Sequence, residues 1–192
     1  ALHTARELDP HATAAFVPQG DLFTALERPA DAAKAYRAAL ASRTDSVADD
    51  SALRLKLADA LAAGGEAAAA IQEYQRTAIA NPTNPGIQMT LANAYRQLGR
   101  SDRALAQYQQ IIRLLPSYPF AYIKQGELLD ELGEAAAALT AYQAAVQAAP
   151  KSADAVLTLA SVYRKRDMIP EAIAAYEAGL QLDPTREGAR AA

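Results

Sequence analysis

Apolar residues recur at three- and four-residue spacing along most of this chain. Between Pro85 and Tyr118 they form two stretches, one of Ile87, Leu91, Ala94, Tyr95 and Leu98 and one of Ala104, Leu105, Tyr108, Ile111 and Ile112. This spacing is typical of one buried face of a helix. Two helices are therefore predicted in this segment.

The residues between and after these stretches mark helix ends. Gly99 stands where a helix C-terminus favours a left-handed residue, and Ser101 or Asp102 is expected to cap the next helix. Pro116 lacks an N–H and cannot continue a helix. The segment is predicted to be a helical hairpin.

The same pattern returns at a constant interval along the chain. Three columns keep this period: the prolines Pro82, Pro116, Pro150 and Pro184; the alanines Ala70, Ala104, Ala138 and Ala172; and the tyrosines Tyr74, Tyr108, Tyr142 and Tyr176. An earlier copy contains Ala32 and Tyr36, displaced by four residues. A fixed period of this size indicates a repeat array, and we expect the alanines and tyrosines to pack between helices.

These residues resemble the tetratricopeptide repeat, a helix–turn–helix unit of about 34 residues. A small residue precedes the next large one by three positions in each copy, reading Gly20, Ala58, Ala92, Gly126 and Ala160. The resemblance implies an all-α fold, a right-handed superhelical α-solenoid of about five full repeats with partial units at both ends. The chain has no Trp. The repeat position that usually holds Trp is occupied here by Phe16, Arg54, Gln88, Tyr122 and Val156. We expect Arg54 and Gln88 to lie at the edge of the packing.

The alignment of the copies sets the expected boundaries. The full repeats are expected at residues 13–46, 51–84, 85–118, 119–152 and 153–186. Residues 47–50 are an insertion of about one helical turn, expected to extend the following helix at its N-terminal end. Residues 1–12 resemble the tail of a preceding repeat and 187–192 the start of a further or capping helix, so we expect a fragment or processed product of a longer protein.

The first helices of the repeats carry a second stripe besides their packing face. In proteins that resemble this one, such helices line a concave groove that holds a partner. The expected groove residues are an apolar row of Val17, Leu55, Met89, Ile123 and Leu157, a polar row of Asp21, Asp59, Asn93, Glu127 and Ser161, a third row containing Arg96, Asp130 and Arg164, and Phe120. The alternative is that the apolar row partly packs between adjacent first helices.

Composition and motifs exclude several other functions. A net charge of −3 argues against a nucleic-acid surface, which needs a cationic field. No apolar stretch approaches the roughly 20 residues that span a bilayer, so direct membrane insertion is not expected. The only histidines, His3 and His11, have no visible metal-ligand or general-base partner, and no catalytic motif is present. We expect no cofactor, no metal and no enzymatic activity.

The favoured function is a non-catalytic scaffold or adaptor that binds a peptide or helix of a protein partner in the groove. Acidic residues beside the apolar row suit a partner with apolar anchors and basic flanks. Two alternatives stay open: a self-assembling scaffold that forms homo-oligomers through uncapped ends, and a recruiting arm of a larger enzyme or of a secretion or assembly machine. The sequence does not identify the compartment, although the cytoplasm is favoured.

Overall fold

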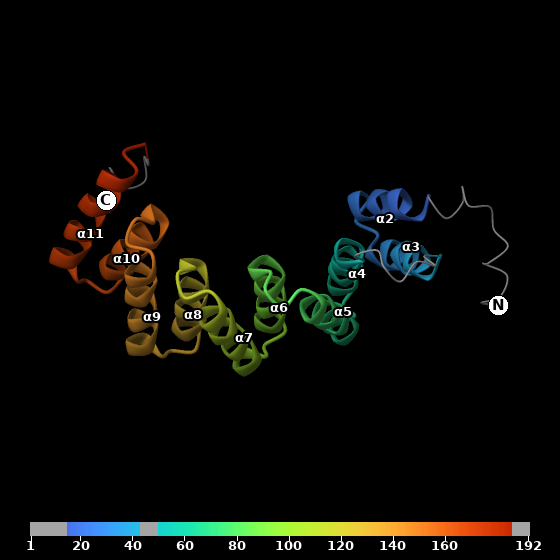
Figure 1. Cartoon of the computed structure of the whole chain (residues 1–192), viewed down its shortest axis with the longest axis horizontal. Helices are drawn as coiled ribbons and strands as arrows, with labels where there is room; N and C mark the ends of the chain where they lie inside the picture. The colour runs from blue at the N-terminus through green and yellow to red at the C-terminus, as the bar shows by residue number, and fades with distance from the viewer. Residues whose placement is uncertain (1–14, 43–49, 186–192) are drawn as a thin grey trace. The chain divides into compact units, whose positions relative to one another are not determined.

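A computed structural model describes residues 15–42 and 50–185, and the segments described are helices joined by short turns (Figure 1). The helices are α2 (Phe16–Ala25), α3 (Pro29–Ser42), α4 (Ser51–Ala63), α5 (Ala67–Ala80), α6 (Pro85–Gln97), α7 (Ser101–Leu114), α8 (Pro119–Glu131), α9 (Ala135–Ala148), α10 (Ala153–Lys165) and α11 (Ile169–Leu182). Strands are absent from these residues. The expectation of an all-α protein is confirmed.

The helices repeat with the sequence period. The even-numbered helices α4, α6, α8 and α10 begin at residues 51, 85, 119 and 153, and the odd-numbered α5, α7, α9 and α11 at 67, 101, 135 and 169, so the starts within each set are evenly spaced. The chain divides into two compact units, residues 1–94 and 95–192. In the first, α2 packs on α3, α3 on α4 and α4 on α5; in the second, α7, α8, α9, α10 and α11 each pack on the next.

A left-handed backbone closes the turn within each repeat. Gly65, Gly99 and Gly133 have φ of 80°, 66° and 79° at equivalent positions of successive repeats. The matching positions of the first and last repeats hold Glu27 with φ 54° and Asp167 with φ 59°. The predicted role of Gly99 is confirmed. Because a Cβ disfavours this conformation by roughly 1–2 kcal/mol, packing of the flanking helices holds Glu27 and Asp167 in place.

The alanine and tyrosine columns form the interior of the hairpins. Ala32, Ala70, Ala104, Ala138 and Ala172 are at most 3% exposed. Among the tyrosines, Tyr36, Tyr74, Tyr108 and Tyr142 are buried and Tyr176 is half-buried. The expectation that both columns pack between helices is therefore confirmed.

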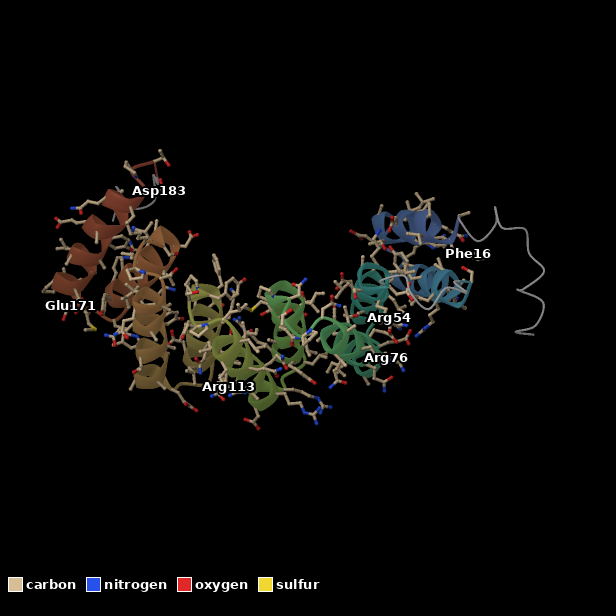
Figure 2. All side chains as sticks on the ribbon, viewed as in Figure 1. Phe16, Arg54, Arg76, Arg113, Glu171 and Asp183 are labelled. Carbon is tan, nitrogen blue, oxygen red and sulfur yellow. The ribbon has the colours of Figure 1, made fainter. Side chains whose placement is uncertain are left out.

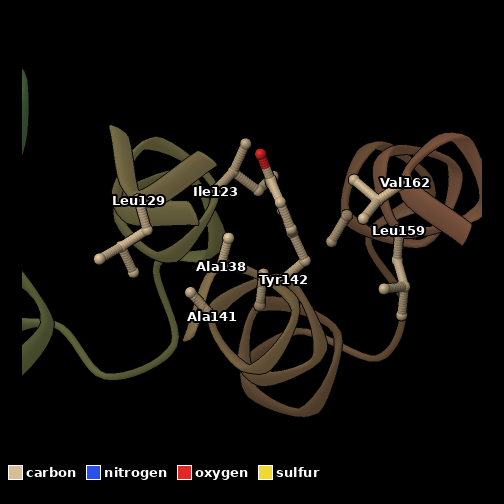
Figure 3. Close-up of a cluster of buried hydrophobic side chains, with 9 residues drawn as sticks. Ile123, Leu129, Ala138, Ala141, Tyr142, Leu159 and Val162 are labelled. Atoms are coloured by element: carbon tan, nitrogen blue, oxygen red, sulfur yellow. The ribbon is translucent and has the colours of Figure 1, made fainter. Parts of the chain in front are cut away.

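The small-residue column makes room for these tyrosine rings. A Cβ added to Gly20 would lie 2.4 Å from Cε1 of Tyr36, and one added to Gly126 would lie 2.9 Å from the ring of Tyr142. In the second unit Tyr142 rises from α9 between Ile123 of α8 and Val162 of α10 (Figure 3). The tyrosine thus links its own hairpin to the next repeat.

Gln88 corrects one expectation from the sequence. It is 4% exposed, not at the edge of the packing, and its amide donates to the carbonyl oxygens of Ala78 at 2.8 Å and Asn81 at 3.2 Å. Ala78 lies in the last turn of α5, where carbonyls lack helical partners. A polar side chain is buried here because it satisfies these carbonyls.

Arg54, the other polar residue in that column, is half-buried and lies closer to the expectation. Its guanidinium and that of Arg76 both pair with Glu73, at 3.0 and 2.6 Å. Figure 2 labels Arg54 on α4 and Arg76 on α5. Glu73 itself is only 8% exposed, so two cations compensate one largely buried carboxylate.

Two expected helix starts differ from those observed. α4 begins at Ser51 with Asp50 as its N-cap, and has 13 residues like α6, α8 and α10. Asp50 therefore does not lengthen the helix, and residues 47–49 lie outside the described residues, as do residues 1–12 and 187–192. Ser101 and Asp102 lie inside α7, whose N-cap is Arg100, because the preceding turn closes one residue earlier than expected.

Candidate partner-binding surface

Asp21 on α2 is held by two side chains of the first unit. Nζ of Lys56, on α4, donates to both of its oxygens at 2.6 and 2.8 Å, and the hydroxyl of Tyr36 donates at 2.8 Å. The hydrogen bond from Lys56, followed by that from Tyr36, lowers the pKa of Asp21. The same ion pair raises the pKa of Lys56. The ion pair between Asp21 and Lys56 thus connects neighbouring repeats.

Asp59 on α4 has a different environment. Its carboxylate accepts a hydrogen bond from the hydroxyl of Tyr74, and burial, followed by this bond, raises the pKa of Tyr74. Among the described residues no cationic side chain pairs with Asp59. Glu27, in the turn between α2 and α3, is exposed and likewise has no cationic partner in that part of the chain.

These carboxylates line one cleft of about 570 Å³ within the first unit. Its walls come from α2, the following turn, α3 and α4, and its floor includes Pro29, Ala60 and Ala63. Three carboxylates and one lysine line it, namely Asp21, Glu27, Asp59 and Lys56. The cleft combines an apolar floor with an excess of negative charge.

The second unit neutralises its corresponding carboxylates internally. Arg96 pairs with Glu127 at 3.0 Å and also with Glu131, and Lys124 pairs with Glu127 at 2.9 Å. The hydrogen bond that Arg96 donates to Glu131 raises the pKa of Arg96 and lowers the pKa of Glu131. A cationic ligand would have to displace these existing pairs.

The remaining polar candidates of this unit also make internal contacts. Asp130 accepts from Arg166 at 2.6 Å and from the hydroxyl of Tyr142 at 3.1 Å. Ser161 and the hydroxyl of Tyr176 lie 3.2 Å apart. Arg164 is exposed, with its guanidinium carbon 5.8 Å from the centre of the Tyr176 ring. Asp130 and Ser161, which were predicted to contact a partner, therefore form contacts within and between the hairpins.

The apolar row does not form the continuous exposed floor expected of it. Ile123 is 6% exposed and belongs to the buried cluster around Tyr142, so little of its side chain is accessible to a partner. Leu157 packs on α11, because a Cβ at Gly179 would lie 2.3 Å from its Cδ2. Both side chains pack against neighbouring helices, but Leu157 does so against the second helix of its own repeat and not against an adjacent first helix. Among the other groove candidates Phe120 is 42% exposed, and four are half-buried: Val17, Leu55, Met89 and Asn93.

Some residues important to this surface were missed in the sequence. Lys56, Lys124 and Glu131 occupy none of the predicted rows, yet each pairs with a residue of those rows. The contacts of the tyrosine hydroxyls, in contrast, have a constant offset that was visible in the sequence. Tyr36, Tyr74 and Tyr176 each follow their partner, Asp21, Asp59 and Ser161, by 15 residues. That offset places a polar residue of the first helix opposite the phenol of the second.

Over residues 15–42 and 50–185, no group of three or more His, Asp or Glu side chains is arranged to hold a metal ion. Among the helices described, none is long and apolar enough to cross a bilayer. His3 and His11 lie outside the described residues.

The tandem hairpins define a class of α-helical repeat protein, and comparison of the sequence with family models identifies the family. A tetratricopeptide repeat model matches residues 17–85, 89–153 and 123–187. The chain therefore belongs to the tetratricopeptide repeat family, and its fold is an all-α solenoid. Members of this family are protein-interaction scaffolds, which supports that role at a general level. A search of curated proteins gives no significant match.

Solved structures of similar fold include other tetratricopeptide repeat proteins. A crystal structure of MamA superposes with a TM-score of 0.62 at 21% identity, covering 88% of this chain and 96% of MamA. A repeat protein from Parabacteroides merdae gives 0.66 at 19% identity, covering 92% of this chain and 68% of that one. One from Thermus thermophilus gives 0.57 at 22% identity, covering 93% and 95%. At these identities the likeness establishes the fold alone.

Proposed function

We propose that this protein is a non-catalytic scaffold. Its first unit binds an extended segment of a partner protein and recognises one basic side chain of that segment. The observation that carries the proposal is the 570 Å³ cleft containing Glu27 and Asp59. Neither carboxylate pairs with a cation among the described residues. The partner chemistry is thus an arginine or lysine flanked by apolar residues.

The apolar floor supports this choice of ligand. The methylene groups of a lysine or arginine pack on apolar surface while the charged end reaches a carboxylate. Pro29, Ala60 and Ala63 supply such a surface. Lys56 remains engaged with Asp21, so the incoming cation is recognised by Glu27 and Asp59.

This proposal narrows the expectation drawn from the sequence. Acidic side chains along the whole set of first helices were expected to flank the partner, but those of the second unit are already paired with Arg96, Lys124 and Arg166. Charge-based recognition is therefore assigned to the cleft of the first unit.

A matched pair of peptides tests the proposal. Fluorescein-labelled extended peptides with leucine and alanine flanks carry either arginine or uncharged citrulline at the centre, and binding is measured by fluorescence anisotropy. A charge-assisted hydrogen bond contributes about 1.5–3 kcal/mol, so the arginine peptide is expected to bind about tenfold or more tightly. Asp59→Asn and Glu27→Gln should each remove most of that preference.

The control is Glu127→Gln, which removes one negative charge at the position equivalent to Asp59 two repeats later. Because Glu127 is already paired, the preference for arginine should survive this change. Equal binding of both peptides to the wild type, or an equal loss in Glu127→Gln and Asp59→Asn, would refute the proposal.

A further inference from the structure

The second unit contains two related clefts. Their lining residues belong to none of the predicted groove rows. The larger, about 690 Å³, is lined by α7, α8 and α9, and the smaller, about 390 Å³, by α9, α10 and α11. On α8 the larger cleft uses Tyr122, Gln125 and Leu129. These residues recur at spacings of three and four and form a stripe distinct from Glu127 and Asp130.

The two clefts are the same site one repeat apart. Five lining positions correspond after a shift of one repeat: Ile112 with Val146, Tyr122 with Val156, Gln125 with Leu159, Ala141 with Ala175, and Ala144 with Ala178. Tyr122 and Val156 stand at the repeat position that usually holds Trp, so both clefts lie at that position. A recurring cleft of this kind is a property of the repeat.

Small side chains leave the clefts open. The wall that α9 gives to the larger cleft consists of Ala137, Thr140, Ala141 and Ala144, and α11 places Ala175 and Ala178 at the smaller one. These small side chains do not fill the space beside Tyr122 and Val156. The floor remains apolar and partly accessible, because Ile112, Tyr122 and Val146 are half-buried.

The larger cleft carries a charge opposite to that of the first-unit cleft, and the smaller cleft has no charged lining residue. Neither lining contains a carboxylate, whereas the larger cleft includes Arg113. Arg113 is exposed and forms no ion pair with any residue in the described ranges. Figure 2 labels it on α7. An apolar floor beside an uncompensated guanidinium complements an apolar ligand carrying a carboxylate.

We propose that these two clefts form a second docking surface, which binds an acidic amphipathic helix of a partner protein. Apolar side chains on one face of the helix enter the successive clefts, as amphipathic helices do in hydrophobic grooves. A carboxylate flanking that face pairs with Arg113. This surface is independent of the basic segment proposed for the first unit, so one protein would bind two ligands of opposite charge.

Two synthetic helices serve as probes. One peptide of about 18 residues, five turns of about 3.6 residues, carries leucines at spacings of three and four with glutamates beside them; the second replaces every glutamate with lysine. Anisotropy titrations should give a Kd for the acidic peptide about tenfold or more below that of the basic one. Equal affinity, or tighter binding of the basic peptide, would overturn the proposal.

Variants locate the binding. Arg113→Glu and the cleft-filling Ala144→Leu should each raise the Kd of the acidic peptide about tenfold or more, and Arg113→Lys should retain most of the affinity. The matched control Arg103→Glu makes the same charge change on α7 outside the cleft, and Asp59→Asn tests the other site; both should leave the Kd unchanged. Circular dichroism and thermal melting establish that each variant is folded.

Other occupants give different results. If a second copy of this chain fills the clefts, light scattering without peptide will show mass rising with concentration, and Arg113→Glu will suppress that rise; this outcome would overturn a heterologous partner. Loss of binding in Asp59→Asn but not in Arg113→Glu would move the acidic helix to the other cleft and equally refute the proposal.

Discussion

The hydroxyl of Tyr74 donates a hydrogen bond to a carboxylate oxygen of Asp59, 15 residues earlier in the chain. The same offset joins Tyr36 to Asp21 and Tyr176 to Ser161. Each pair connects the second helix of a hairpin to the first. Asp59 therefore both lines the cleft of the first unit and connects α4 to α5.

Tyr74→Phe tests how much the hydrogen bond between Tyr74 and Asp59 stabilises the hairpin. The change removes a hydrogen bond to a carboxylate but preserves the buried ring, so we expect the free energy of unfolding to fall by about 1–2 kcal/mol. Urea denaturation followed by circular dichroism measures the loss. In an Asp59→Ala background the same substitution should cost markedly less; an equal loss in both backgrounds would contradict a direct interaction.

Acid titration should reveal the Lys56–Asp21 pair. Lys56 and Tyr36 lower the pKa of Asp21 in the folded protein, so the stabilisation is present above the unfolded value of about 3.9 and is lost as the pH falls through the lower folded value. Wild type should exceed Asp21→Asn in stability at pH 7 and pH 5, with the difference shrinking below about pH 4. A difference that grows on acidification would contradict the assignment.

Gly20 and Gly126 should tolerate no added methyl group. Overpacking a buried site costs about 1–3 kcal/mol, against a helix-propensity gain of about 1 kcal/mol for Gly→Ala. Because the added Cβ at Gly20 would approach the Tyr36 ring more closely than that at Gly126 approaches Tyr142, Gly20→Ala should lower the melting temperature further than Gly126→Ala. The control is Gly86→Ala, whose Cβ would meet only Asn84 Oδ1, at 3.3 Å, and which should melt no lower than wild type.

Gln88 provides a test of the buried amide. Gln88→Leu leaves the carbonyls of Ala78 and Asn81 without this donor, so we expect a loss of about 1–3 kcal/mol in the free energy of unfolding, despite the added apolar surface. Gln88→Glu should be worse at neutral pH, since a carboxylate would face two carbonyl oxygens, and should recover partly on acidification. Stability of Gln88→Leu equal to that of wild type would remove the capping role.

The repeat period and the helical hairpins were predictable because they depend on local patterns. Gly99 indicated a left-handed turn, and the pairing of alanines with tyrosines four residues later indicated a packed helix face. The interior position of Gln88 was not predictable, since the carbonyls it satisfies belong to the preceding repeat. A polar residue in an otherwise large-residue column looks the same in sequence whether it is exposed or hydrogen-bonded inside.

The positions of the acidic candidates along the first helices were predictable from the sequence, but their pairing with cations was not. Helical spacing placed Asp21, Asp59 and Glu127 on one stripe. Which of them retain uncompensated charge depends on long side chains from neighbouring repeats, such as Lys56 and Arg96, reaching across about one repeat. Such contacts follow from the packing of hairpins and leave no periodic signature.

The left-handed backbone at Glu27 has a consequence for the dynamics of the first repeat. Three equivalent turns use glycine, which adopts this conformation without a steric penalty, whereas Glu27 is held there by the helices on either side. Brief separation of α2 from α3 relieves that strain, so we expect amide protons of these helices to exchange with deuterium sooner than those of the glycine-closed repeats. The carboxylate of Glu27, proposed to meet a partner, would then lie on a hairpin that opens more readily than the glycine-closed ones.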